Sequence, residues 1–153
     1  MKRAMHTIVS KTLIAAVIGS VRHAAGARIP GHALEAAGYN VVPLSAFSPP
    51  ADFVNAAVET NADGILVYSL HGRGEPECRG FREICVEAGI GEILAYFIGI
   101  PDDSTDDWRA VEERFLTMGF DRAFPSGTGA NDIASALACD FLARAGGIPR
   151  DHP

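Results

Sequence analysis

The sequence predicts an α/β fold, in which helices cover both faces of a parallel sheet. The 153-residue chain has the length of one ordinary domain, and its 48% hydrophobic residues can form a substantial core. Short apolar runs of strand length alternate five times with segments of helical length. Successive strand–helix–strand units join parallel strands through right-handed crossovers. The pattern therefore favours a five-stranded flavodoxin-like sheet of order 2-1-3-4-5.

The elements follow from the apolar runs and from the glycines that separate them. The expected strands are 13–19, 39–44, 64–69, 92–98 and 121–125. The expected helices are about 30–38, 48–58, 75–88, 108–118 and 131–144, with Gly38 and Gly89 as stops and Ser48 as a candidate cap. Pro30 fits a first helical turn, which leaves 20–29 as a long loop. One domain then spans 11–145, between a loose tail at 1–10 and a frayed tail at 146–153.

Composition excludes several classes of function. The net charge of −6 argues against nucleic acid or an anionic membrane as a partner. Lysine occurs only at positions 2 and 11, which removes most lysine-based chemistry. The three cysteines lack metal-site spacing and favour a reducing, cytoplasmic location, and Cys78 and Cys85 are expected to share one helix face. The start resembles a weak signal peptide, but its removal would take the first strand, so we expect none. No other segment has the length and apolarity to span a bilayer.

A histidine follows the first strand, in the loop of residues 20–26. In an open parallel sheet, ligands bind at the carboxyl ends of the strands, so His23 lies at the expected ligand-binding edge. A neutral imidazole there can bind a metal or transfer a proton, whereas the alternative is a solvent-facing loop histidine. The same edge collects the loops 68–74, 99–104 and 126–129.

Other ligands of this architecture match the sequence poorly. A flavin mononucleotide loop needs hydroxyl groups and glycines where Val21 and Arg22 stand, and a phosphoacceptor domain needs acidic residues after the first and third strands. The glycines of 70–75 are a weak phosphate signal. A Ser20–His23 hydrolase would lack an acid to orient the histidine.

Resemblance to a known family distinguishes further among these possibilities. In register from about Lys11 to Leu137, the chain is similar to the small, cobalamin-binding subunit of glutamate mutase (methylaspartate mutase). The stretches that carry the similarity are Val17-Ile-Gly-Ser20, His23-Ala24 with Gly26, Gly38-Tyr-Asn-Val-Val42, Glu59-Thr60 with Ala62-Asp63, Ser69-Leu70, Gly72 with Gly74-Glu75, Glu87-Ala-Gly89, Trp108, Val111-Glu112 with Arg114-Phe115, Met118-Gly-Phe-Asp-Arg122 and Gly127-Thr128.

The resemblance implies a cobalamin-carrying subunit of a carbon-skeleton isomerase. In that family the cofactor binds with its lower base detached, a loop histidine ligates cobalt, and the nucleotide tail enters the sheet edge. Adenosylcobalamin is presented to a large barrel-type subunit, so this chain would hold no catalytic residue and would be inactive alone. By resemblance His23 is the cobalt ligand. The implied cofactor-binding residues are Ser20, Val21, Arg22, His23, Ala24, Gly26, Tyr68, Ser69, Leu70, Gly72, Gly99, Ile100, Gly127 and Thr128.

Three positions depart from the family motifs. Val21 stands where Asp-x-His-x-x-Gly has its aspartate, which accepts the other ring N–H of the histidine. Tyr68 replaces the serine of Ser-x-Leu, and Ile98 replaces the first glycine of Gly-Gly. We expect Tyr68 to obstruct the nucleotide slot. The alternative function is a cobalamin-free interaction or regulatory module on the same scaffold, in which Tyr68 and Ile98 close the slot.

Overall fold

The computed structural model describes residues 11–18, 31–44, 49–69, 78–99, 107–125 and 127–145. Its centre is a five-stranded, all-parallel sheet of order β2-β1-β3-β4-β5, which confirms the predicted fold class and strand order. The strands are β1 (Thr12–Ile18), β2 (Asn40–Pro43), β3 (Gly64–Ser69), β4 (Leu94–Gly99) and β5 (Arg122–Pro125). Because β3 and β4 are buried along their whole length, they are apolar on both faces rather than alternating.

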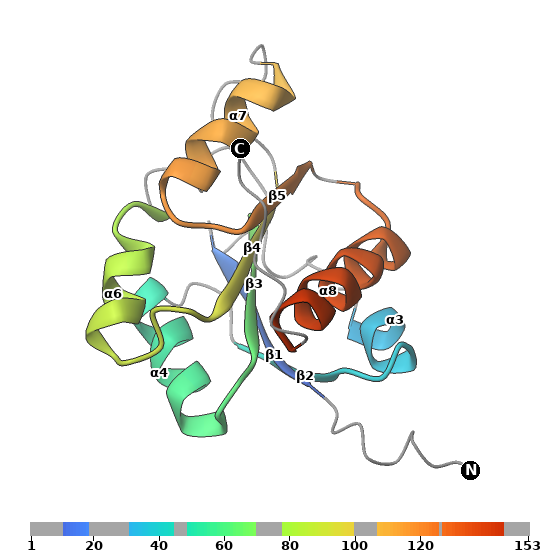
Figure 1. Ribbon diagram of the computed structural model, residues 1–153, viewed down its shortest axis with the longest axis horizontal. Coiled ribbons are helices and arrows are strands. Elements are labelled where there is room, and N and C mark those ends of the chain that lie inside the picture. The colour runs from blue at the N-terminus through green and yellow to red at the C-terminus, as the bar shows by residue number, and fades with distance from the viewer. Residues whose placement is uncertain are drawn as a thin grey trace.

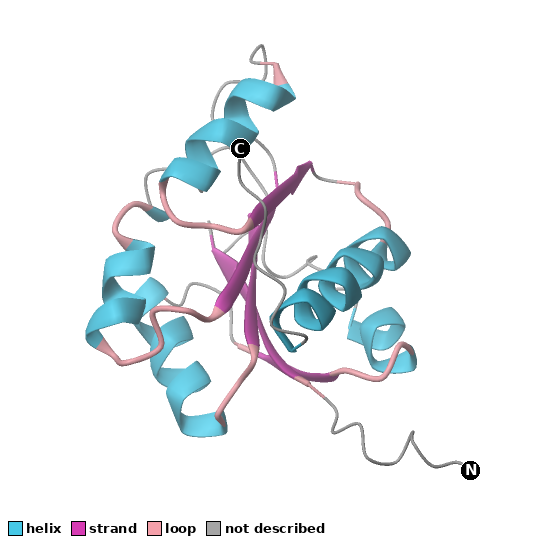
Figure 2. Ribbon diagram, in the orientation of Figure 1, coloured by secondary structure: helices cyan, strands magenta, loops and turns pink. Residues whose placement is uncertain are grey.

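Helices cover both faces of the sheet (Figures 1 and 2). On one face lie α4 (Pro50–Thr60), α6 (Phe81–Glu87) and α7 (Trp108–Thr117), and on the other lie α3 (Gly31–Ala36) and α8 (Ala130–Ala145). The core accordingly forms two clusters. The ring of Phe97 stacks on that of Phe115 of α7 with centroids 3.9 Å apart, whereas Tyr96, the preceding residue, belongs to the cluster beneath α8.

Several element boundaries differ from those predicted. The helix expected at 75–88 is interrupted: Cys78 is helical, Arg79 and Gly80 form a turn in which Gly80 adopts a left-handed conformation (φ 81°), and α6 begins at Phe81. Cys78 and Cys85 are both buried in the same cluster, which confirms that they pack there, but the turn at Gly80 separates them, so they do not share the face of one helix. Pro49, not Ser48, occupies the N-cap position of α4.

The fourth strand is displaced toward the carboxyl terminus. It was expected at 92–98, but Glu92 lies in a turn and Gly99 continues the ladder, paired with Ser69 and Pro125. The expected loop therefore begins after Gly99. The predicted helix stops at Gly38 and Gly89 are confirmed, because α3 ends before Gly38, α6 ends before Gly89, and both glycines have positive φ.

Side-chain hydrogen bonds tie together the amino ends of the strands. Arg82 of α6 donates to the carbonyl oxygens of Gly91, Ile93 and Gly119 at 2.6–3.0 Å, so one side chain connects the segments that precede β4 and β5. The carboxylate of Asp121 accepts the backbone N–H of Ala95 at 2.9 Å, and that of Asp63 accepts the N–H of Thr12 at 2.8 Å. This edge is fixed by bonds between segments distant in sequence.

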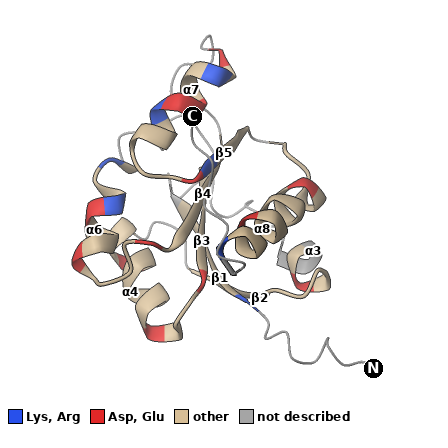
Figure 3. Cartoon of the chain, in the orientation of Figure 1, with Lys and Arg blue, Asp and Glu red and all other residues tan. Residues whose placement is uncertain are grey.

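Charged residues gather on the helices and at the strand ends (Figure 3). Most of the interior is apolar; Ser69 and Asp140 are its buried polar residues among those described. In the described part of the chain, no helix has the length and apolarity needed to cross a membrane.

Candidate functional site

The carboxyl ends of the strands form the edge at which the sequence analysis placed a ligand. Strand order reverses between β1 and β3, and in open α/β sheets ligands bind in the crevice outside such a switch point. The register sets Val17 beside Tyr68 and Tyr68 beside Ile98, and in the next row Ser69 lies between Ile18 and Gly99. Tyr68, Ser69 and Gly99 are therefore brought together, as expected.

Much of the implied cofactor site lies outside the described residues. The residues in question are Ser20, Val21, Arg22, His23, Ala24, Gly26, Leu70, Gly72 and Ile100. The expected loop at 20–29 lies there too. The cofactor-binding roles assigned to these residues remain predictions. The part of the predicted site that the structure describes lies at the ends of β3, β4 and β5.

Tyr68 points into the layer beneath α8. Val17, Tyr68 and Ile98 lie in one row on that face of the sheet, with exposed fractions of 5, 8 and 5%. Ile133 and Leu137 of α8 belong to the same cluster and are buried. The aromatic ring and the isoleucine thus fill the space between the strand ends and this helix.

The hydroxyl group of Tyr68 is buried without a hydrogen-bond partner. Among the side-chain polar atoms of the described residues, it alone has this status. Burial raises the pKa of Tyr68 above its ordinary value, because the phenolate would lose its hydration. An unpaired buried hydroxyl destabilises the folded chain by about 1–3 kcal/mol. The apolar contacts of the Tyr68 ring must therefore outweigh this unfavourable contribution to keep the side chain buried.

Gly99 and Gly127, the two described glycines of the predicted site, have different local surroundings. A Cβ atom added to Gly99 would come within 2.8 Å of both Cβ and the carbonyl oxygen of Ser69, so the close approach of β3 and β4 requires glycine there. Gly127 has a φ of 95°, and open space lies where its Cβ would be. The Thr128 hydroxyl donates to the carbonyl of Pro125 at 2.7 Å and thereby closes the turn before α8.

A partly buried polar network beneath α8 was not foreseen from the sequence. Tyr96 donates its hydroxyl proton to Asp140 at 2.5 Å, and Arg122 donates to both carboxylate oxygens of Asp140 at 2.8 and 3.0 Å. Burial and the Asp140 carboxylate raise the pKa of Tyr96, and hydrogen bonding to Asp140 raises that of Arg122. The signal available in the sequence was a single aspartate on the apolar face of the last helix.

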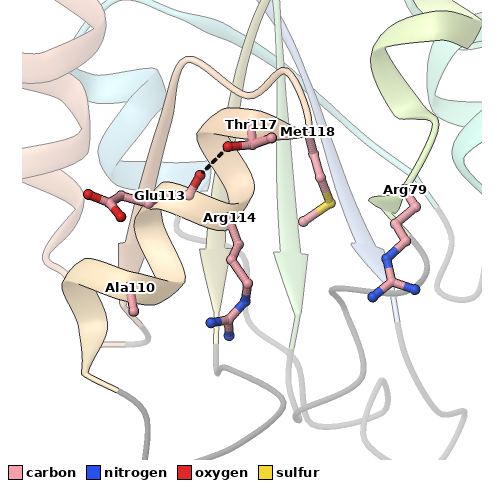
Figure 4. A pocket seen from close by; sticks show the side chains of 6 residues that line it. All are labelled: Arg79, Ala110, Glu113, Arg114, Thr117 and Met118. Carbon is pink, nitrogen blue, oxygen red and sulfur yellow. Dashed lines mark hydrogen bonds between the residues drawn. The ribbon is translucent and has the colours of Figure 1, made fainter.

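A separate cavity of about 520 Å³ lies on the opposite face of the sheet, beside α7 (Figure 4). Arg79 and Arg114 extend their guanidinium groups toward the carboxyl ends of the strands, and the Thr117 hydroxyl donates to the carbonyl of Glu113 at 2.9 Å. These four residues line the cavity together with Ala110 and Met118. The cavity shares no residue with the predicted site. Within the described ranges, no three His, Cys, Asp or Glu side chains are grouped as metal ligands would be.

Individual known proteins, rather than a family model, show the family of this chain. No family model matches the chain. The chain is 49% identical over 118 residues to the glutamate mutase sigma subunit of Clostridium tetani, covering 77% of this chain and 86% of that one. It is 44% identical over 131 residues to the sigma subunit of Fusobacterium nucleatum, covering 86% and 96%. A crystal structure of a cobalamin-binding protein from Desulfitobacterium hafniense shares the fold, with a TM-score of 0.61 at 18% identity over 85% of this chain and 58% of that one. The chain belongs to the family of glutamate mutase sigma subunits.

Proposed function

We propose that this chain is the cobalamin-binding subunit of a glutamate-mutase-like carbon-skeleton isomerase. It would hold adenosylcobalamin at the carboxyl edge of the sheet and present it to a large barrel-type subunit in the cytoplasm. The observation that carries the proposal is the identity of 44–49% to sigma subunits over most of the chain. The parallel sheet of order 2-1-3-4-5 supports it, since it supplies a ligand crevice at the β1/β3 switch point.

The assigned roles follow from position in the chain. His23, five residues after the end of β1, would ligate cobalt through a ring nitrogen, and Gly26 would let the loop approach the corrin. Val21 has no acceptor for the second ring N–H, so water or a carbonyl group would have to orient the imidazole. When bound, adenosylcobalamin supplies the radical chemistry of the rearrangement. The substrate belongs to the partner subunit in this proposal.

The described residues do not fit the nucleotide portion of cobalamin. Tyr68 and Ile98 fill the layer between the strand ends and α8, and Gly99 is packed against Ser69. The proposal therefore concerns the corrin ring and its cobalt ligand, and assigns no binding role to these four residues toward the nucleotide.

Spectroscopy of the reconstituted protein tests the cobalt ligand. Wild-type protein mixed with hydroxocobalamin should give a base-off, histidine-ligated spectrum. After one-electron reduction of the Co(III) to Co(II) by a chemical reductant such as dithionite, the EPR signal should show nitrogen hyperfine splitting from His23. The variant His23→Ala should lose that splitting and bind more weakly. As a companion variant, Val21→Asp should raise the affinity by about 10–100-fold, because it restores an acceptor for the ring N–H. An unchanged hyperfine pattern in His23→Ala would contradict the assignment.

A second candidate is a cobalamin-free interaction or regulatory module. The burial of Tyr68 and Ile98 favours it, since these side chains close the layer in which the family's nucleotide slot is expected. In that case the purified protein would show no corrinoid absorption after incubation with hydroxocobalamin, and His23→Ala would behave like the wild type.

A further inference from the structure

We propose that this chain selects corrinoids by their lower nucleotide, and that it binds a corrinoid lacking the nucleotide at least as tightly as it binds cobalamin. The inference rests on the proposed function and names the ligand class of the same site. Tyr68 is the residue that determines the preference, with Ile98 beside it.

The first argument is the space available at the ligand edge. A substituent that leaves a corrin ring toward the sheet must pass over one face of the strand ends or remain in solvent. Beneath α8, Val17, Tyr68 and Ile98 lie side by side on neighbouring strands and are buried in one cluster. On the opposite face, Val67 and Phe97 are fully buried. The rows at these strand ends are buried, so a nucleotide that entered the layer beneath α8 would have to displace Tyr68 or Ile98.

The second argument is the chemistry of the nucleotide. In cobalamin the base at the end of the nucleotide can itself coordinate cobalt, so a protein imidazole must displace it. A protein that receives the displaced base in a slot regains part of this cost by burying the base. Here the aromatic ring of Tyr68 lies where the strand ends meet α8, so the displaced base gains no burial. A corrinoid without the nucleotide has no competing base, so His23 would have only a water ligand to displace.

The third argument concerns the ring of Tyr68 rather than its hydroxyl. The hydroxyl makes no hydrogen bond, so apolar contacts of the ring hold the side chain in place. Phenylalanine would fill the same volume. The variant Tyr68→Phe is thus a matched control, because it keeps the obstruction and removes only the unpaired oxygen.

The experiment compares two matched ligands. Aquacobinamide, which lacks the nucleotide, and hydroxocobalamin are titrated into the full-length protein and followed by visible absorption. For the wild type and for Tyr68→Phe, the Kd for cobinamide should be equal to or lower than that for cobalamin. Tyr68→Ser should lower the Kd for cobalamin by tenfold or more and leave that for cobinamide within about twofold. Circular dichroism confirms folding, and Ile98→Ala replaces Tyr68→Ser if the latter is unfolded.

The outcomes separate this inference from the proposed function. Tighter binding of cobalamin than of cobinamide by the wild type overturns the selectivity and leaves the proposed function standing. An unchanged ratio of the two Kd values in the folded serine or alanine variant overturns the role of the Tyr68–Ile98 pair. Binding of neither ligand by the wild type overturns the proposed function and the inference together.

Discussion

Two buried tyrosines on the same face of the sheet should respond in opposite directions to loss of their hydroxyl groups. Tyr68 of β3 and Tyr96 of β4 both lie beneath α8 and are 8% and 0% exposed. The hydroxyl of Tyr68 has no partner, whereas that of Tyr96 donates to Asp140 at 2.5 Å. The two substitutions to phenylalanine remove the same atom from similar surroundings, so each is the control for the other.

The expected magnitudes follow from these contacts. Tyr68→Phe removes a buried unpaired hydroxyl and should raise the free energy of unfolding by about 1–3 kcal/mol. Tyr96→Phe removes a hydrogen bond to a carboxylate and should lower it by about 1.5–3 kcal/mol. The cost stays in that range because Asp140 keeps both hydrogen bonds from Arg122. In a domain of this length, each kcal/mol shifts Tm by roughly 2–4 °C.

Urea denaturation followed by circular dichroism measures both changes against the wild type. The m-values should be unchanged, so that shifts in the midpoint report stability alone. A decrease in stability for Tyr68→Phe, or the same sign for both variants, would refute the reasoning from hydrogen-bond pairing. It would mean that the Tyr68 hydroxyl is satisfied in solution.

Two further outcomes are expected. Arg82→Met leaves the carbonyls of Gly91, Ile93 and Gly119 without their donor, so it should lower the free energy of unfolding in urea by about 3 kcal/mol or more. The control Arg109→Met, at an exposed position, should change that free energy by less than about 0.5 kcal/mol. Equal effects of the two variants would exclude the bridging role of Arg82. Burial raises the pKa of Tyr68 above the ordinary tyrosine value of about 10, so on raising the pH the unfolded chain loses this proton before the folded chain does. The free energy of unfolding should therefore be independent of this group below about pH 10 and fall above it, and it should fall less steeply in Tyr68→Phe. An identical dependence on pH in the two proteins would contradict burial of the Tyr68 hydroxyl as the cause.

The fold could be predicted because its signals are local. Each strand is a short apolar run, and each is followed by a segment long enough for a crossover helix, which leaves few arrangements for a parallel sheet. Positions of glycine located the ends of α3 and α6 correctly. The start of α6 was missed because residues 75–88 have helical composition, and the left-handed conformation of Gly80 depends on packing that the sequence does not display.

The candidate site was predictable in part for the same reason. The position of Tyr68 at the end of a strand follows from chain order, and the structure adds that its ring is buried beneath α8. That Tyr68 obstructs a nucleotide stays a prediction. The network of Tyr96, Arg122 and Asp140 joins residues 18 and 44 positions apart in the sequence. Side chains so distant in sequence have no shared spacing, so only the folded structure brings them together.

The separation of the two edges of the sheet bears on how such a domain can diverge. Arg82, Asp63 and Asp121 anchor the amino ends of the strands, whereas Tyr68 and Ile98 lie near the other end, roughly 15–20 Å away along a six-residue strand. Substitutions at the ligand edge leave those anchoring bonds intact. A substitution at the ligand edge can therefore change stability through its own contacts, as at Tyr68, while the bonds that fix the amino ends of the strands stay in place.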